Sequence, residues 1–145
     1  MRQELSHDVK ANAYLTPANQ KALSPHYDTH DVFVLQISGK KHWNFYDDTN
    51  FKTPLLNSFQ PIFKEGQLTG KKEVTIEAGD LMYIPRGLPH EAYTSDESSL
   101  HLTIGVYPTQ HVDLLSKAVQ SLAQNDLDLR KALPVGFLNF TEAEK

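Results

Sequence analysis

The stretch AGDLMYIPRGLPHEAYT, residues 78–94, shows the pattern of short apolar runs separated by turns that indicates the fold class. A tight turn at Ala78-Gly79-Asp80 is followed by the apolar run Leu81–Ile84 and then by a bend that contains two prolines and a glycine. A second run, from His90 to Thr94, follows the bend. Short apolar runs separated by turns are typical of antiparallel sheets, so this stretch predicts two β-strands and a mainly β fold.

The same alternation of apolar runs and turns extends from Val9 to Val106, which indicates an antiparallel β sandwich or barrel. The expected strands are Val9–Leu15, Asp31–Ser38, Lys40–Tyr46, Glu73–Glu77, Leu81–Ile84, His90–Thr94 and Leu100–Val106. Gly39 separates two of them, which could form a hairpin. The stretch Pro54–Gly70 is expected to be a long loop.

After Pro108 the apolar residues recur at helical spacing, which predicts a change from strands to helices. The recurring residues are Val112, Leu115, Ala118, Val119 and Leu122. A second short helix is expected from about Leu127 to Leu133, with Pro134 stopping it. We therefore expect a barrel over residues 1–108 and a helical segment over residues 109–145. The apolar stripe of the helix serves either for packing on the sheet or for dimerisation.

The composition excludes several classes of protein. A chain of 145 residues with 39% hydrophobic and 22% charged residues is an ordinary globular domain. Its formal net charge of −4 argues against a direct nucleic-acid partner. No apolar run approaches the roughly 18 residues of a membrane-spanning helix, so no membrane association is expected. Met1–Ala13 lacks the apolar core of a signal peptide, and we expect a cytoplasmic location.

The chain has no cysteine, so a metal site would have to use histidine and carboxylate groups. His26 lies two residues before Asp28, and in an extended chain both side chains leave from the same side. His90 follows the proline-rich bend and could complete a two-histidine, one-carboxylate face, which suits non-haem Fe(II). A lone His-x-Asp is more often a surface turn. The order of His-x-Asp, several strands, the bend and His90 is much more specific.

Lys41 is unusual because of the face on which it lies. In the strand expected at Lys40–Tyr46 it shares one face with Trp43 and Phe45. A lysine directed into a barrel interior is costly unless an anion neutralises it, and a carboxylate-bearing cosubstrate would do so. The alternative is a lysine at the barrel mouth whose ammonium reaches water.

Other polar residues are placed by the same alternation. In the last strand His101 lies on the face opposite the leucines, as a pocket residue or as an ordinary hydrogen-bonded histidine. Asn12 and Tyr14 share a face of the first strand, and the same two interpretations apply to them. The remaining histidines are expected to be solvated or structural: His7, His30, His42 and His111.

Several motifs, in order, closely resemble the JmjC-type ribosomal oxygenases, also called the cupin-4 family. The motifs are Asn12-Ala13-Tyr14-Leu15-Thr16-Pro17, Pro25-His26-Tyr27-Asp28, Asp31-Val32-Phe33-Val34-Leu35-Gln36, Gly39-Lys40-Lys41-His42-Trp43, Gly79-Asp80-Leu81-Met82-Tyr83-Ile84-Pro85-Arg86-Gly87 with His90, and Ser99-Leu100-His101-Leu102-Thr103-Ile104. The resemblance runs from about Asp8 to Phe137, which is nearly the whole chain.

This resemblance implies a double-stranded β-helix and protein hydroxylation that depends on Fe(II), 2-oxoglutarate and dioxygen. His26, Asp28 and His90 match the metal triad, and Lys41 matches the lysine that binds the far carboxylate of 2-oxoglutarate. The residues that match polar positions lining the same pocket are Asn12, Tyr14 and His101. The implied substrate is an Arg or His side chain of a ribosomal protein. Two other functions stay open: a non-catalytic cupin that binds a metal or ligand, and a JmjC lysine demethylase.

The chain also departs from the family it resembles. Family members often carry Gln-Gly before the His-x-Asp motif, where this chain has Lys21-Ala22, so that loop is expected to differ in shape or substrate preference. Family members have a segment before the position of Asn12 that buttresses the barrel, and the chain is expected to lack it. They also dimerise through helices that follow the barrel, which makes a homodimer through residues 109–145 the alternative to packing on the sheet.

Overall fold

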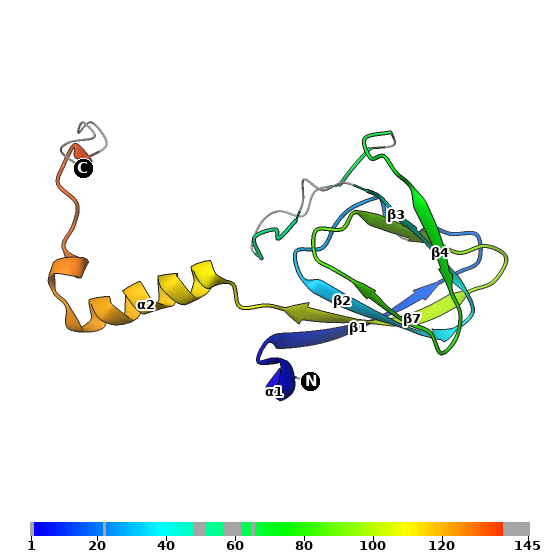
Figure 1. Ribbon diagram of the computed structural model, residues 1–145, viewed down its shortest axis with the longest axis horizontal. Helices are drawn as coiled ribbons and strands as arrows, with labels where there is room; N and C mark the ends of the chain where they lie inside the picture. Colours follow the sequence, from blue (N-terminus) through cyan, green and yellow to red (C-terminus); the bar gives the residue numbers. More distant parts are fainter. Residues whose placement is uncertain (1, 22, 48–51, 57–61, 65, 138–145) are drawn as a thin grey trace. The chain divides into compact units, whose positions relative to one another are not determined.

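The computed structural model describes residues 2–21, 23–47, 52–56, 62–64 and 66–137. In these residues the chain forms a short helix, α1 (Arg2–Leu5), and then a series of strands (Figure 1). The strands are β1 (Asp8–Thr16), β2 (Asp31–Ser38), β3 (Lys41–Phe45), β4 (Lys72–Ile76), β5 (Leu81–Ile84), β6 (His90–Tyr93) and β7 (Ser99–Tyr107). All of the expected strands are confirmed, and their ends agree to within about one residue. The expected loop Pro54–Gly70 lies partly outside the described residues.

The strands form two antiparallel sheets that face each other (Figure 1). One sheet has the order β1-β7-β2-β5 and the other the order β4-β3-β6. The segment between β1 and β2 runs along β6, to which it is joined by isolated bridges at Lys21↔Tyr93 and His26↔His90. The chain crosses repeatedly between the two sheets, and this topology confirms the expected double-stranded β-helix.

The hairpin expected around Gly39 is wrong, because β2 and β3 belong to different sheets. Gly39 has a φ of 65°, and a Cβ at this position would lie 2.0 Å from the Ser98 carbonyl oxygen. Glycine is therefore required where the chain passes closely under the β6–β7 connection. The Gln36 amide donates to the carbonyl oxygens of Ser38 and Gly39, which holds the crossing in place.

The core lies between the two sheets, where alternate side chains of the strands point inward. Its buried members are Val32, Val34, Trp43, Ile76 and Ile84. Because the strands alternate with a period of two, the same inward faces also carry the polar residues of β1, β3 and β7 that the sequence singled out. One inner surface thus serves both as core and as pocket wall.

The chain divides into two compact units, Met1–Pro108 and Thr109–Lys145. The second unit contains helix α2 (His111–Asn125), which begins where the Gln110 backbone N–H donates to the Asp113 carboxylate at 2.9 Å. Within this unit no residue of α2 is buried. No helix in the described part of the chain is long and apolar enough to cross a membrane.

The second short helix expected at Leu127–Leu133 is confirmed only in part, as a shorter 3-10 helix. The chain forms only a 3-10 turn there, η2 (Asp128–Arg130), and Lys131 is already extended with φ −65° and ψ 142°. The Lys131 N–H donates to the Asp128 carbonyl oxygen three residues back, which is the 3-10 pattern, and such helices are short because their hydrogen-bond geometry is poorer. The last part of the expected helical segment, residues 138–145, lies outside the described residues.

Candidate metal and cosubstrate site

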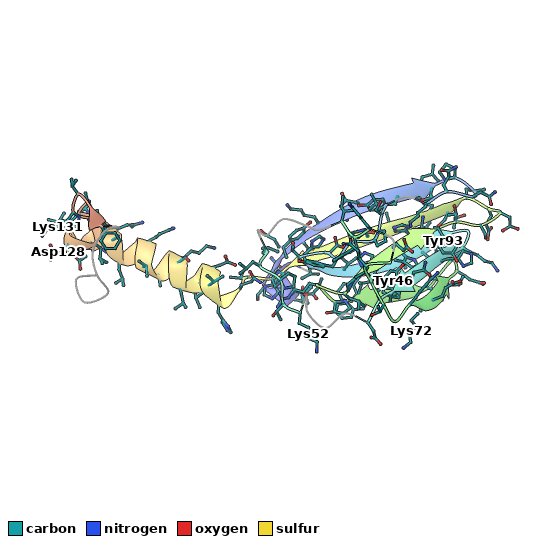
Figure 2. The ribbon with its side chains drawn as sticks, turned by 90° about the horizontal axis from the view of Figure 1, so that it is seen from above. Tyr46, Lys52, Lys72, Tyr93, Asp128 and Lys131 are labelled. Atoms are coloured by element: carbon teal, nitrogen blue, oxygen red, sulfur yellow. The ribbon has the colours of Figure 1, made fainter. Side chains whose placement is uncertain are left out.

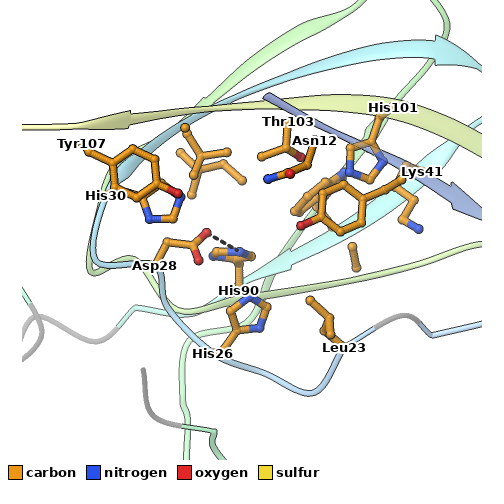
Figure 3. A pocket seen from close by; sticks show the side chains of 16 residues that line it. Asn12, Leu23, His26, Asp28, His30, Lys41, His90, His101, Thr103 and Tyr107 are labelled. Carbon is orange, nitrogen blue, oxygen red and sulfur yellow. Dashed lines mark ion pairs between the residues drawn. The ribbon is translucent and has the colours of Figure 1, made fainter. Parts of the chain in front are cut away.

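A pocket of about 290 Å³ opens between the two sheets (Figure 3). Its walls come from β1, β2, β3, β5, β6 and β7 and from the segment that joins β1 to β2. All of the residues predicted to form a site line this pocket, namely Asn12, Tyr14, His26, Asp28, Lys41, His90 and His101. The structure therefore brings together residues that are spread over most of the first unit.

Two histidines and one aspartate meet at one end of the pocket (Figure 3). One donor atom from each of His26, Asp28 and His90 lies within 4.8 Å of the others. The Nε2 atom of His90 is 3.7 Å from an Asp28 carboxylate oxygen. His26 and Asp28 come from the segment after β1, whereas His90 is the first residue of β6. The three side chains form a two-histidine, one-carboxylate cluster of the kind that binds divalent transition metals.

Both histidine rings are oriented by the backbone. His26 Nδ1 lies 2.7 Å from the carbonyl oxygen of Ser24, and His90 Nδ1 lies 2.9 Å from that of Leu88. A carbonyl oxygen can only accept, so each Nδ1 carries a proton, and in a neutral ring of this tautomer the lone pair lies on Nε2. Burial and the neighbouring His26 lower the pKa of His90, which favours the neutral ring. Neutral rings with a free Nε2 are the form in which histidine binds a metal.

Lys41 lies deep in the wall of the pocket, with 0% of its surface exposed. The alternative of a lysine at the barrel mouth is therefore wrong. Its ammonium donates to the Thr16 hydroxyl at 2.7 Å, and no carboxylate among the described residues pairs with it. Burial lowers the pKa of Lys41 to about 8. A buried cation without a counter-ion is suited to bind an anion that enters the pocket.

The residues around Lys41 complete this end of the pocket. His101 stacks on Tyr14 with ring centroids 5.1 Å apart, and its buried Nδ1 has no hydrogen-bond partner. Burial and the charge of Lys41 lower the pKa of His101 to about 4, so the ring is neutral. Of the two interpretations left open for His101, the structure shows a pocket position. Thr16 was missed, although it follows Asn12 and Tyr14 in the same alternation.

His30 differs from the expectation of a solvated or structural histidine. It lines the pocket beside Asp28 and stacks on Tyr107 with ring centroids 4.3 Å apart (Figure 3). Gly105 makes room for it, because a Cβ there would lie 2.8 Å from the His30 ring. The alternation that selects His26 and Asp28 continues to His30, and this signal could have identified it. His42, by contrast, bonds to Thr75 at 2.8 Å, in agreement with a structural role.

Comparison with known proteins gives matches over most of the chain. A family model described as JmjC domain matches residues 1–114. The chain is 39% identical over 135 residues to the Drosophila grimshawi bifunctional lysine-specific demethylase and histidyl-hydroxylase NO66, covering 88% of the chain and 19% of that protein. It is 38% identical over 142 residues to ribosomal oxygenase 1 of Gallus gallus, covering 90% of the chain and 23% of that protein.

The solved structures that are similar to the chain include YcfD, a ribosomal oxygenase from Escherichia coli. The TM-score is 0.54 at 24% identity, over 80% of the chain and 28% of YcfD. At this identity the similarity supports the fold alone. The chain spans about a fifth of the length of the curated relatives that it matches.

Proposed function

This chain belongs to the JmjC domain family, and from that premise we propose that it is an Fe(II)- and 2-oxoglutarate-dependent oxygenase. We propose that it hydroxylates an Arg or His side chain of a ribosomal protein. One observation carries the proposal. A single pocket holds a two-histidine, one-carboxylate cluster at one end and a buried lysine without a carboxylate partner in its wall. A metal and a dicarboxylate would satisfy both features together.

The three proposed metal ligands fit Fe(II). Two imidazoles and one carboxylate would leave about three coordination positions of the metal open, as non-haem Fe(II) oxygenases require. The Ser24 and Leu88 carbonyl groups hold the two rings with Nε2 toward the pocket. When bound, iron with 2-oxoglutarate and dioxygen supplies the oxidising chemistry.

Lys41 would bind the far carboxylate of 2-oxoglutarate, with Thr16 holding its ammonium in place. Asn12, Tyr14 and His101 supply further polar groups to the same part of the pocket. Their more specific roles stay predictions. Trp43 also lines the pocket, and its apolar surface would limit the access of water to the bound cosubstrate.

Lysine demethylation is the second candidate function, because several relatives are named as both a lysine-specific demethylase and a histidyl-hydroxylase. The same names favour histidine over arginine as the hydroxylated residue, and the Gallus gallus relative suggests a ribosomal protein as substrate.

A cytoplasmic location stays a prediction. A homodimer through α2 is also a proposal. It is supported by the apolar stripe of that helix, which its own unit leaves uncovered, with Leu115 66% and Leu122 62% exposed.

The test is to incubate the full chain with Fe(II), 2-oxoglutarate and ribosomal proteins and to search by mass spectrometry for one added oxygen atom. A trimethyl-lysine peptide, with formaldehyde as the measured product, tests the demethylase in parallel. Asp28→Ala is the matched control, since it removes one proposed ligand from a cluster that is otherwise intact. If the chain binds the metal but forms no succinate above the Asp28→Ala background, the non-catalytic cupin becomes the better account.

A further inference from the structure

Lys21, which departs from the family resemblance, has a specific partner in the structure. Its ammonium forms an ion pair with Oε2 of Glu91. Glu91 directly follows the proposed metal ligand His90 on β6 and is only 7% exposed, whereas the Lys21 side chain is 52% exposed. The departure at Lys21 therefore lies beside a buried carboxylate next to the metal cluster.

Glu91 is also held from the neighbouring strand. Its Oε1 accepts hydrogen bonds from the Asn44 amide at 2.9 Å and from the Tyr46 hydroxyl at 2.7 Å. Asn44 belongs to β3, and Tyr46 is the first residue after the end of β3. The strand β3 pairs with β6, and Figure 2 shows Tyr46 of the first segment and Tyr93 of the second. One carboxylate thus joins β3, β6 and the segment that contains Lys21. A buried carboxylate needs such partners, so its position is well defined.

The ion pair lies between two isolated backbone bridges that join the segment after β1 to β6. Lys21 is bridged to Tyr93, and further along His26 and His90 exchange backbone hydrogen bonds of 3.0 and 2.7 Å. The Lys21 side chain therefore connects the segment after β1 to Glu91, the residue of β6 that follows His90.

We propose that the Lys21–Glu91 ion pair acts as a clamp that keeps the segment of His26 and Asp28 in position against the strand of His90. Lys21 and Glu91 are then positioning residues for the metal. The inference rests on the proposed function, since it assumes that these three residues bind the metal. Donors from two separate segments must keep their spacing to within a few tenths of an ångström, so a slip between the segments weakens binding.

The test measures Mn(II) affinity by calorimetry, with Mn(II) as a redox-stable probe. Lys21→Met removes the charge at nearly constant length, and Lys21→Arg restores it. We expect Lys21→Met to weaken Mn(II) binding about tenfold, the lower end of the range for residues outside the ligand shell, and Lys21→Arg to recover most of it. Glu91→Gln should weaken Mn(II) binding too. The double variant with Lys21→Met should bind Mn(II) with nearly the same affinity as Glu91→Gln alone. The matched control is Lys40→Met, which breaks the exposed pair with Glu77 and should leave the affinity unchanged.

The melting temperature without metal separates positioning from general stability. A structural role alone would lower that temperature in Lys21→Met while the Mn(II) affinity stayed within twofold of the unaltered chain, and this result would overturn the clamp. If Glu91→Gln fails to fold, the comparison of Lys21→Met with Lys21→Arg decides, because the Lys21 side chain is half exposed. An unaltered chain that takes up no Mn(II) overturns the proposed function and the clamp together. Binding that His90→Ala abolishes and Lys21→Met leaves intact overturns the clamp alone.

Discussion

Replacing Lys41 with methionine should stabilise the chain and remove its response to 2-oxoglutarate. Burial lowers the pKa of the Lys41 ammonium from its usual 10.5 to about 8. At about 1.4 kcal/mol per pKa unit, keeping this group charged costs the folded state about 3 kcal/mol at neutral pH. In the variant, the loss of the hydrogen bond to Thr16 offsets about 1 kcal/mol of this stabilisation. The expected net gain in the free energy of unfolding is about 2 kcal/mol.

The gain depends on pH in a defined direction. The unfolded chain holds the Lys41 proton more tightly than the folded chain, so the cost is present in full below about pH 8. It declines as the pH rises from about 8 to 10.5 and is absent above that range. Lys41→Met should therefore raise the melting temperature at pH 7, by about 4 °C per kcal/mol, and much less near pH 10. The affinity of the unaltered chain for 2-oxoglutarate should fall as the pH rises through about 8, because the ammonium is then lost.

The assay is thermal unfolding at both pH values, with and without Mn(II) and 2-oxoglutarate, together with calorimetry for the cosubstrate. Lys40→Met is the matched control, because the adjacent Lys40 forms an exposed ion pair, which contributes little to stability. A Lys41→Met variant that melts lower than this control at pH 7 would refute the account of Lys41 as an uncompensated buried cation. Equal affinity for 2-oxoglutarate in variant and unaltered chain would refute its role as the carboxylate anchor.

Four further variants test other parts of the proposed site and fold. His90→Ala should abolish the rise in melting temperature caused by Fe(II) or Mn(II), worth about 2.7 kcal/mol at a hundredfold excess over the dissociation constant, and a persistent rise would remove His90 from the site. Asp28→Ala should reduce the conversion of 2-oxoglutarate to succinate to the enzyme-free rate, and remaining turnover would contradict its role as a ligand. Leu115→Asp combined with Leu122→Asp should convert a dimer seen by light scattering into a folded monomer, whereas an unaltered chain that is monomeric at high concentration would contradict dimerisation. Gly39→Ala should cost about 2 kcal/mol or more, because the φ of 65° and a Cβ 2.0 Å from a carbonyl oxygen both oppose a side chain, and an unchanged melting temperature would show that the crossing can relax.

Much of the fold could be predicted from local sequence. The strands were predicted almost to the residue, since turn residues separate short apolar runs and the alternation of side chains has a period of two. The same alternation placed Lys41 on the inner face with Trp43, where the structure has it, but left two interpretations open for His101. It also predicted the helix around Leu115, because helical periodicity is a local property. The assignment of His26, Asp28 and His90 as metal ligands stays a prediction, which their proximity in the pocket supports.

What only the tertiary structure decided are the contacts between residues that are far apart in the chain. Local patterns place a side chain on a face but do not say which residue lies opposite, so Thr16 as the partner of Lys41 could not be predicted. The partnership of Lys21 with Glu91 arises only when the segment after β1 lies along β6. In the same way the Gly39 turn joins two sheets instead of closing a hairpin. These contacts form only when the two sheets pack against each other. Strands that are far apart in sequence then become neighbours, and their distance in sequence does not predict their distance in space.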